Sequence, residues 1–157
     1  MKRLFVKLAL TVITILGITV AADTIAQPQT ASASTTSYSK VYKVAKAQLG
    51  KRYSYGSTGP SSFDCSGFTS YVYKKSAKIT TPRTAQAQYN KYAHVSYKNI
   101  KKGDLVFFGG SVFGISHVGL YVGSGKMIDA QNRGVVKEAV KAPWWHYVGS
   151  ARVTSLD

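Results

Sequence analysis

Residues 61–75 read SSFDCSGFTSYVYKK and contain Cys65, the only cysteine in the 157-residue chain. Ser62 or Asp64 can cap a helix that begins near Cys65, because both side chains accept hydrogen bonds from first-turn N–H groups. The two lysines that end the stretch suit the negative end of a helix dipole. The sequence therefore predicts a helix from about Cys65 to Lys75 with a thiol in its first turn.

The segments around this helix predict an α+β fold. An apolar stripe along residues 39–49, followed by Gly50, indicates a preceding helix, and residues 84–92 indicate a shorter third one. From residue 104 onward the pattern changes to short apolar and alternating runs. Strands are expected at residues 105–108, 116–122, 126–130, 135–140 and 147–153. Helices first and strands afterwards favour helices packed on one antiparallel sheet.

The position of Cys65 suits a nucleophile. A thiolate is the reactive form of cysteine, and the N-terminus of a helix stabilises that negative charge. The same first-turn N–H groups can stabilise an oxyanion in acyl transfer. A free cysteine is otherwise commonly a small buried hydrophobe, but the polar neighbours Asp64 and Ser66 weigh against that interpretation.

A cysteine nucleophile needs a histidine as its base, and the chain has three. His94 follows the third predicted helix in a polar stretch, and His146 lies in an aromatic segment that suggests packing or a surface ledge. His117 instead opens a predicted strand, and Gly119, beside it on the same face, leaves room for another group. Cysteine with a distant histidine is typical of thiol hydrolases, so His117 is the candidate general base.

A third group orients the imidazole, and the register of the expected hairpin narrows the choice. With residues 123–125 as a three-residue loop, Asp129 lies on the His117 face and Gln131 lies directly opposite His117. A two-residue loop would place Asp129 among apolar side chains, which is costly. The pattern therefore favours the three-residue loop and Asp129, with Gln131 as the alternative.

Residues 1–33 predict a secretory signal peptide, because a basic start precedes an apolar run and small residues. The apolar run is about 15 residues, short of the roughly 20 that a spanning helix needs, so a membrane anchor is the weaker interpretation. Cleavage after Ala33 fits best, and Ala26 and Ala22 are looser matches. The rest, residues 34–157, suffices for one catalytic domain, which we expect to be secreted and to reside at the cell wall.

The chain is strongly basic, with 21 Lys and Arg against 6 Asp and Glu and a formal net charge of +15. Such a charge attracts nucleic acid, anionic lipid or anionic polymers, and it says nothing about the fold. Export and the absence of a recognisable nucleic-acid motif argue against nucleic acid. We expect electrostatic binding to anionic cell-wall polymers and no spanning membrane segment after processing, with a merely solvated basic surface as the alternative.

Five ordered blocks, between about residues 42 and 152, resemble the NlpC/P60 domains. The blocks are YSYG at 53–56, FDCSGF at 63–68, PRTAQ at 82–86, GDLVFF at 103–108 and HVGLYVG at 117–123. The resemblance implies a papain-like fold with the nucleophile at a helix N-terminus. It also implies a secreted cysteine peptidase that cuts peptidoglycan stem peptides, usually at the bond between γ-D-glutamate and a diamino acid.

The resemblance also implies roles for individual residues. Cys65 matches the nucleophile, His117 the general base, and Asp129 the third catalytic position, at which many members have a second histidine. Gln131 or Asn132 could orient the imidazole in place of Asp129. No metal ion or other cofactor is implied.

Four further residues match positions that line the substrate cleft, namely Tyr53, Asp64, Ser66 and Arg83. Asp64 could bind an amine of the stem peptide or cap its own helix. Arg83 could pair with a substrate carboxylate or with Asp104. Tyr53 could donate a hydrogen bond to the substrate or to the oxyanion.

Two other functions compete with this one. An amidase of the CHAP type is also a papain-like Cys–His enzyme, but it cuts between muramic acid and L-alanine. A non-catalytic basic protein could bind the wall with the same fold. The FDCSGF block favours NlpC/P60 over CHAP, and the presence of both Cys65 and His117 argues against a protein that only binds.

Overall fold

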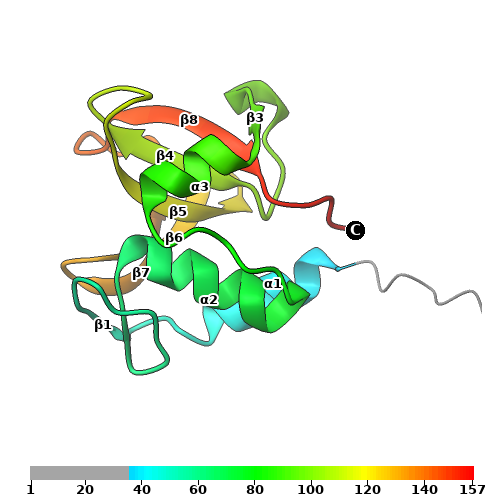
Figure 1. The fold of residues 1–157 in the computed structure, drawn as a ribbon, viewed down its shortest axis with the longest axis vertical. Helices are drawn as coiled ribbons and strands as arrows, with labels where there is room; N and C mark the ends of the chain where they lie inside the picture. The colour runs from blue at the N-terminus through cyan, green and yellow to red at the C-terminus, as the bar shows by residue number, and fades with distance from the viewer. Residues whose placement is uncertain (1–35) are drawn as a thin grey trace, which may run out of the picture. The chain divides into compact units, whose positions relative to one another are not determined.

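The computed structural model describes residues 36–157, so the signal peptide expected at residues 1–33 lies outside the described residues. The helices come first along the chain and pack on an antiparallel sheet formed by later strands, so the expected α+β class is confirmed (Figure 1). The α-helices of this part of the chain are α1 (Tyr38–Lys46), α2 (Cys65–Ala77) and α3 (Ala85–Lys91). None of them is long and apolar enough to cross a membrane.

Six strands among the described residues form one antiparallel sheet in the order β3-β8-β4-β5-β6-β7. They are β3 (Ala93–Val95), β4 (Leu105–Gly109), β5 (Ile115–Gly123), β6 (Lys126–Gln131), β7 (Gly134–Ala139) and β8 (Tyr147–Arg152). The sequence did not predict β3, nor the short parallel pair β1 (Arg52–Tyr53) and β2 (Ser62–Phe63). Two or three residues are too few to show the alternation that indicates a strand.

Helix α2 begins at the predicted residue. The Asp64 side chain accepts a hydrogen bond from the Gly67 N–H over 2.7 Å, so Asp64 rather than Ser62 is the N-cap. The helix runs two residues beyond the expected end and stops where Lys78 adopts the left-handed conformation. The cap fixes the first turn of α2 and therefore the place of Cys65.

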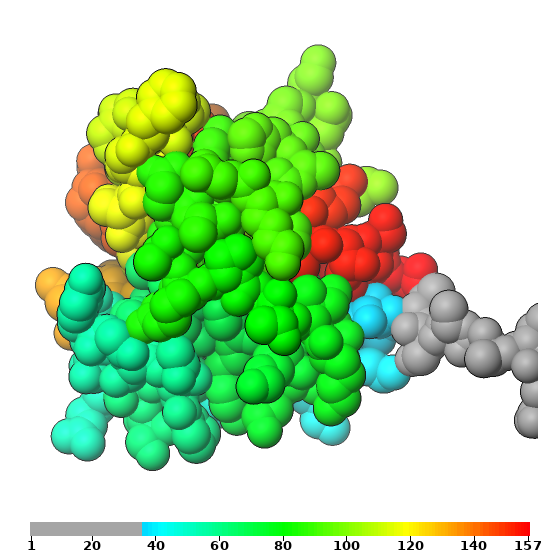
Figure 2. Space-filling model, in the orientation of Figure 1, coloured from blue at the N-terminus to red at the C-terminus, as the bar shows by residue number. Residues whose placement is uncertain are grey.

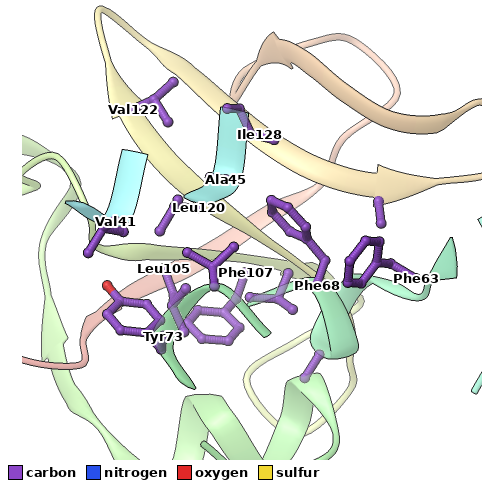
Figure 3. Packing of buried hydrophobic residues seen from close by; sticks show 14 of the residues in the cluster. Val41, Ala45, Phe63, Phe68, Tyr73, Leu105, Phe107, Leu120, Val122 and Ile128 are labelled. Carbon is purple, nitrogen blue, oxygen red and sulfur yellow. The ribbon is translucent and has the colours of Figure 1, made fainter. Parts of the chain in front are cut away.

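The buried face of α2 joins the helices to the sheet. Phe68 and Tyr73 are fully buried in the same core as Leu105, Phe107 and Leu120 of the central strands (Figure 3). Burial of each such side chain contributes about 1.5–3 kcal/mol. Since close packing allows little relative movement, the first turn of α2 keeps a fixed place beside β5.

The β5–β6 hairpin has the expected register, but the prediction of a three-residue loop is wrong. Residues 124–125 form a two-residue turn with positive φ values of 53° and 67°, the conformation that tight hairpins favour. A β-bulge between Tyr121 and Gly123 takes up the remaining residue. Beyond the bulge the strands pair as predicted, so Asp129 stays on the His117 face.

Candidate active site

Three elements bring the predicted catalytic residues together. Cys65 is the first residue of α2, His117 lies on β5, and Asp129 lies on β6. The thiol is partly exposed, the imidazole is buried, and the carboxylate is fully buried. Helix α2 packs on both strands, which sets the thiol beside the histidine and aspartate pair.

Asp129 holds the imidazole of His117. Nε2 of the ring donates a hydrogen bond to Oδ2 of the carboxylate over 2.9 Å, which leaves Nδ1 for the thiol. The predicted room at Gly119 is occupied by neighbouring side chains: a Cβ at this glycine would lie 3.2 Å from the Cβ of Asp129 and 2.7 Å from the sulfur of Met127. A side chain at this position would therefore displace Met127 and press on Asp129.

Gln131, the alternative orienting residue, is engaged elsewhere. Its Nε2 donates to Oε1 of Glu138 over 3.1 Å. The structure thus places Asp129, and not Gln131, against the imidazole.

Glu138 also fixes a tryptophan over the imidazole. The ring of Trp145 stacks on that of His117, with centroids 4.3 Å apart and planes inclined by 13°. Nε1 of Trp145 donates to Oε1 of Glu138 over 2.8 Å, and Arg133 pairs with the same carboxylate over 2.7 Å. Because an aromatic face attracts a cation, this stack favours the protonated imidazole.

Sequence reasoning missed this contact. The sequence of residues 143–146 predicts only packing or a surface ledge. The stack joins the connection before β8 to β5, and no spacing in the sequence reveals such a long-range contact. The only available signal was the pair of adjacent tryptophans, Trp144 and Trp145, in an otherwise ordinary connection.

The charge state of His117 depends on these neighbours. Burial alone would lower the pKa of His117, but the hydrogen bonds and charges of Asp129 and Cys65 outweigh burial and raise it to about 9. Burial raises the pKa of Asp129, and the hydrogen bond from His117 opposes that change. The imidazole therefore stays protonated through neutral pH, with Asp129 as its anionic partner.

The carboxylate of Asp64 is fully engaged. It accepts hydrogen bonds from the N–H groups of Gly67 and Gly56, at 2.7 and 2.9 Å, and it forms an ion pair with Arg83. The Ser66 hydroxyl lies between these two charges, donating to Asp64 and accepting from Arg83. Burial alone would raise the pKa of Asp64, but these contacts outweigh burial and lower it.

The alternative prediction that Arg83 pairs with Asp104 is wrong. Asp104 pairs instead with Arg152 over 2.7 Å, because β8 lies directly beside β4. Arg83 precedes α3 and reaches the first turn of α2. Asp64 thus caps its helix and binds Arg83, and an amine of a substrate would have to displace that guanidinium.

Two cavities meet at Tyr53. One, of about 380 Å³, is lined by Cys65 together with the expected substrate-binding residues Tyr53, Asp64, Ser66 and Arg83. The other, of about 640 Å³, is lined by Tyr53, His117, Gln131, Asn132, Arg133, Trp144 and Trp145. Burial, followed by the charge of Cys65, raises the pKa of Tyr53, so its phenol keeps the proton that it can donate.

Comparison with known proteins gives a consistent result. A sequence model of the NlpC/P60 family matches residues 50–152. The probable endopeptidase p60 of Listeria welshimeri is 52% identical over 115 residues, which are 70% of this chain and 21% of that protein. The bifunctional muramidase/DL-endopeptidase CwlT of Bacillus subtilis is 40% identical over 121 residues, which are 74% of this chain and 36% of that protein.

A solved structure is also similar. It is that of an NlpC/P60 family protein from Bacillus cereus, with a TM-score of 0.72 and 32% identity over 75% of this chain and 40% of that one. The chain spans between about a fifth and two fifths of these three relatives, so the similarity concerns only part of each.

Proposed function

Because the chain belongs to the NlpC/P60 family, we propose that it is a cysteine endopeptidase that hydrolyses peptidoglycan stem peptides. The observation that carries the proposal is the arrangement of a thiol at a helix N-terminus next to an imidazole bonded to a buried carboxylate. Nucleophilic catalysis requires a base next to the nucleophile and a third group that orients the base, and this site has that arrangement. The residues with these roles are Cys65, His117 and Asp129.

The proposed reaction is acyl transfer through a thioester. The Cys65 thiolate attacks the amide carbonyl, and the backbone N–H of Cys65, at the free end of α2, stabilises the oxyanion. Protonated His117 gives its proton to the leaving amine as the C–N bond breaks. Neutral His117 then takes a proton from water, which attacks the thioester and releases the acid and the thiolate.

The position of His117 orients the substrate. Since the leaving amine must reach the imidazolium, the leaving segment occupies the cavity of about 640 Å³ and the acyl segment occupies the cavity that contains Cys65. In the acyl cavity, Tyr53 can donate to the substrate, and the partly exposed guanidinium of Arg83 can pair with a carboxylate. A γ-D-glutamyl residue carries such a carboxylate, so we propose the bond between γ-D-glutamate and the diamino acid as the site of cleavage.

The charge distribution supports retention at the cell wall after export. Four carboxyl side chains of the described residues, those of Asp64, Asp104, Asp129 and Glu138, are buried and bonded to Arg or His. The lysines of residues 36–157 are mostly exposed and thus available to anionic wall polymers. We expect retention on purified walls that is lost as salt rises toward about 1 M; retention unchanged by salt would contradict this.

Fragments released from defined stem peptides test the reaction. The wild-type protein should release a fragment that ends in D-glutamate from a stem peptide with a diamino acid at its third position, as read by mass spectrometry. An L-alanine amino terminus released from a muramyl peptide would instead identify an amidase. Absence of any cleavage by a folded protein would contradict the endopeptidase.

A further inference from the structure

Two almost fully exposed aromatic side chains lie close to the Cys65 cavity, one in its wall and one on a loop that a residue of the wall holds. Tyr55 is 91% exposed and lines the cavity. Phe113 is 92% exposed and lies in the loop between β4 and β5, two residues before Ile115 of the cavity wall. The turquoise segment that contains Tyr55 and the yellow loop at residues 110–114 project on the same side of the molecule (Figure 2). We name Tyr55 and Phe113 the aromatic rim.

The loop that carries Phe113 is held in place from the cavity wall. Gln86 of α3 donates through Nε2 to the carbonyl of Val112 and accepts through Oε1 from the N–H of Ile115, both over 2.9 Å. Within the loop, the Gly114 N–H donates to the carbonyl of Ser111 over 3.0 Å. Gln86 itself lines the Cys65 cavity. The backbone at Phe113 is thus held next to the cavity, so that binding a ligand there does not have to order the loop.

The acyl part of the substrate leads from Cys65 to this rim. At about 380 Å³ the cavity is near the lower end of the roughly 300–1,000 Å³ found for ligand pockets, so it suits a short peptide. In a stem peptide two residues separate muramic acid from the proposed scissile bond. Two extended residues span about 7 Å, so the sugar would leave the cavity at its rim.

The chemistry of the rim matches a sugar ring. A pyranose presents C–H groups on its faces and hydroxyl groups at its edges, so one face can stack on an aromatic ring while the edges stay in water. Tyr55 and Phe113 offer open ring faces at the surface rather than a closed apolar pocket. A lone exposed aromatic side chain is ordinary, but two beside one cavity, one of them on a fixed loop, are not accounted for by packing.

We infer that the aromatic rim binds the saccharide end of the substrate, so that glycan-linked stem peptides are better substrates than free ones. This rests on the proposed function, since it requires the acyl segment to lie in the Cys65 cavity. The rim continues the substrate cavity, which favours the sugar of the same substrate over a lipid surface as the ligand.

Two substrates that differ only in the sugar test the inference. One is a disaccharide-linked stem peptide, and the other is the same peptide with an acetylated amino terminus, so that neither has a free amine. We expect wild-type kcat/KM to be higher for the disaccharide substrate. Phe113→Ala should lower it by about three- to tenfold on that substrate alone. Phe113→Tyr should retain the wild-type kcat/KM on the disaccharide substrate. Tyr55→Ala, like Phe113→Ala, should reduce the preference for the disaccharide substrate over the acetylated peptide.

Leu49→Ala is the matched control, because Leu49 is an exposed apolar residue that does not line the Cys65 cavity. Equal wild-type kcat/KM on both substrates, or an equal loss on both in Phe113→Ala, would overturn the inference. Loss of binding to anionic phospholipid vesicles in Phe113→Ala, without a change in substrate preference, would assign the rim to a membrane instead.

Calorimetry separates the rim from the reaction. In a Cys65→Ala background the disaccharide-linked peptide should still bind more tightly than the acetylated one, and adding Phe113→Ala should remove that difference. If the wild type cleaves neither substrate but this difference is present, the proposed reaction fails and the rim stands. If the difference is absent, the rim fails whatever the activity.

Discussion

Replacement of Cys65 by alanine should reduce the release of soluble fragments from purified peptidoglycan by at least about 10³-fold. The reason is that alanine removes the only atom that can form the thioester. The substitution should not disturb the fold, since Cys65 is the first residue of α2 and alanine is the best helix former. Fragment release followed by mass spectrometry provides the measurement.

Cys65→Ser is the companion variant, because it keeps a side chain of similar shape with a much weaker nucleophile. Both variants should unfold at nearly the wild-type temperature and be inactive. Wild-type turnover by Cys65→Ala would exclude covalent catalysis at this position. It would leave a basic domain of this family that binds the wall by some other chemistry.

Replacement of Asp129 by alanine should lower kcat by about 10²–10⁴-fold, the usual contribution of general acid–base catalysis. Alanine removes the acceptor that holds Nε2 of His117 and the charge that keeps the ring protonated. Asp129→Asn keeps an acceptor oxygen but removes the charge. Its loss should be smaller, so the two variants separate orientation from electrostatics.

The pH profile gives Asp129 a second readout. His117 must be protonated to give a proton to the leaving amine, and its pKa is raised to about 9. Wild-type activity should therefore persist through neutral pH and fall as the pH rises through about 9. In Asp129→Asn the raising influence weakens while burial still lowers the pKa of His117, so this alkaline limb should move to lower pH. An unchanged limb would show that Asp129 does not set the charge of the imidazole.

The position of the candidate site was predictable where its signals are local. Asp64 and Cys65 lie next to each other in the sequence, so the cap and the thiol at the helix start could be inferred together. Asp129 could be placed on the His117 face because a wrong register would bury its charge among apolar residues. The hairpin has that register although its turn is shorter than expected, because a bulge compensates.

The parts that were not predictable depend on contacts between distant segments. The Trp145 stack on His117 requires the connection before β8 to fold back over β5, and Glu138 fixes it from β7. The choice of Arg83 between Asp64 and Asp104 depends on the path of the chain before α3, which no local pattern specifies. Such pairings follow from the packed fold rather than from the spacing of residues.

The alkylation rate of Cys65 by iodoacetamide at pH 6, in the wild type and in His117→Ala, tests the central claim most directly, namely that the thiol and the His117 imidazole react as one pair. Mass spectrometry of the labelled protein gives this rate without any substrate. We predict that His117→Ala slows the labelling by at least about tenfold, because the thiolate loses its cationic partner. Equal rates in the two proteins would contradict the account.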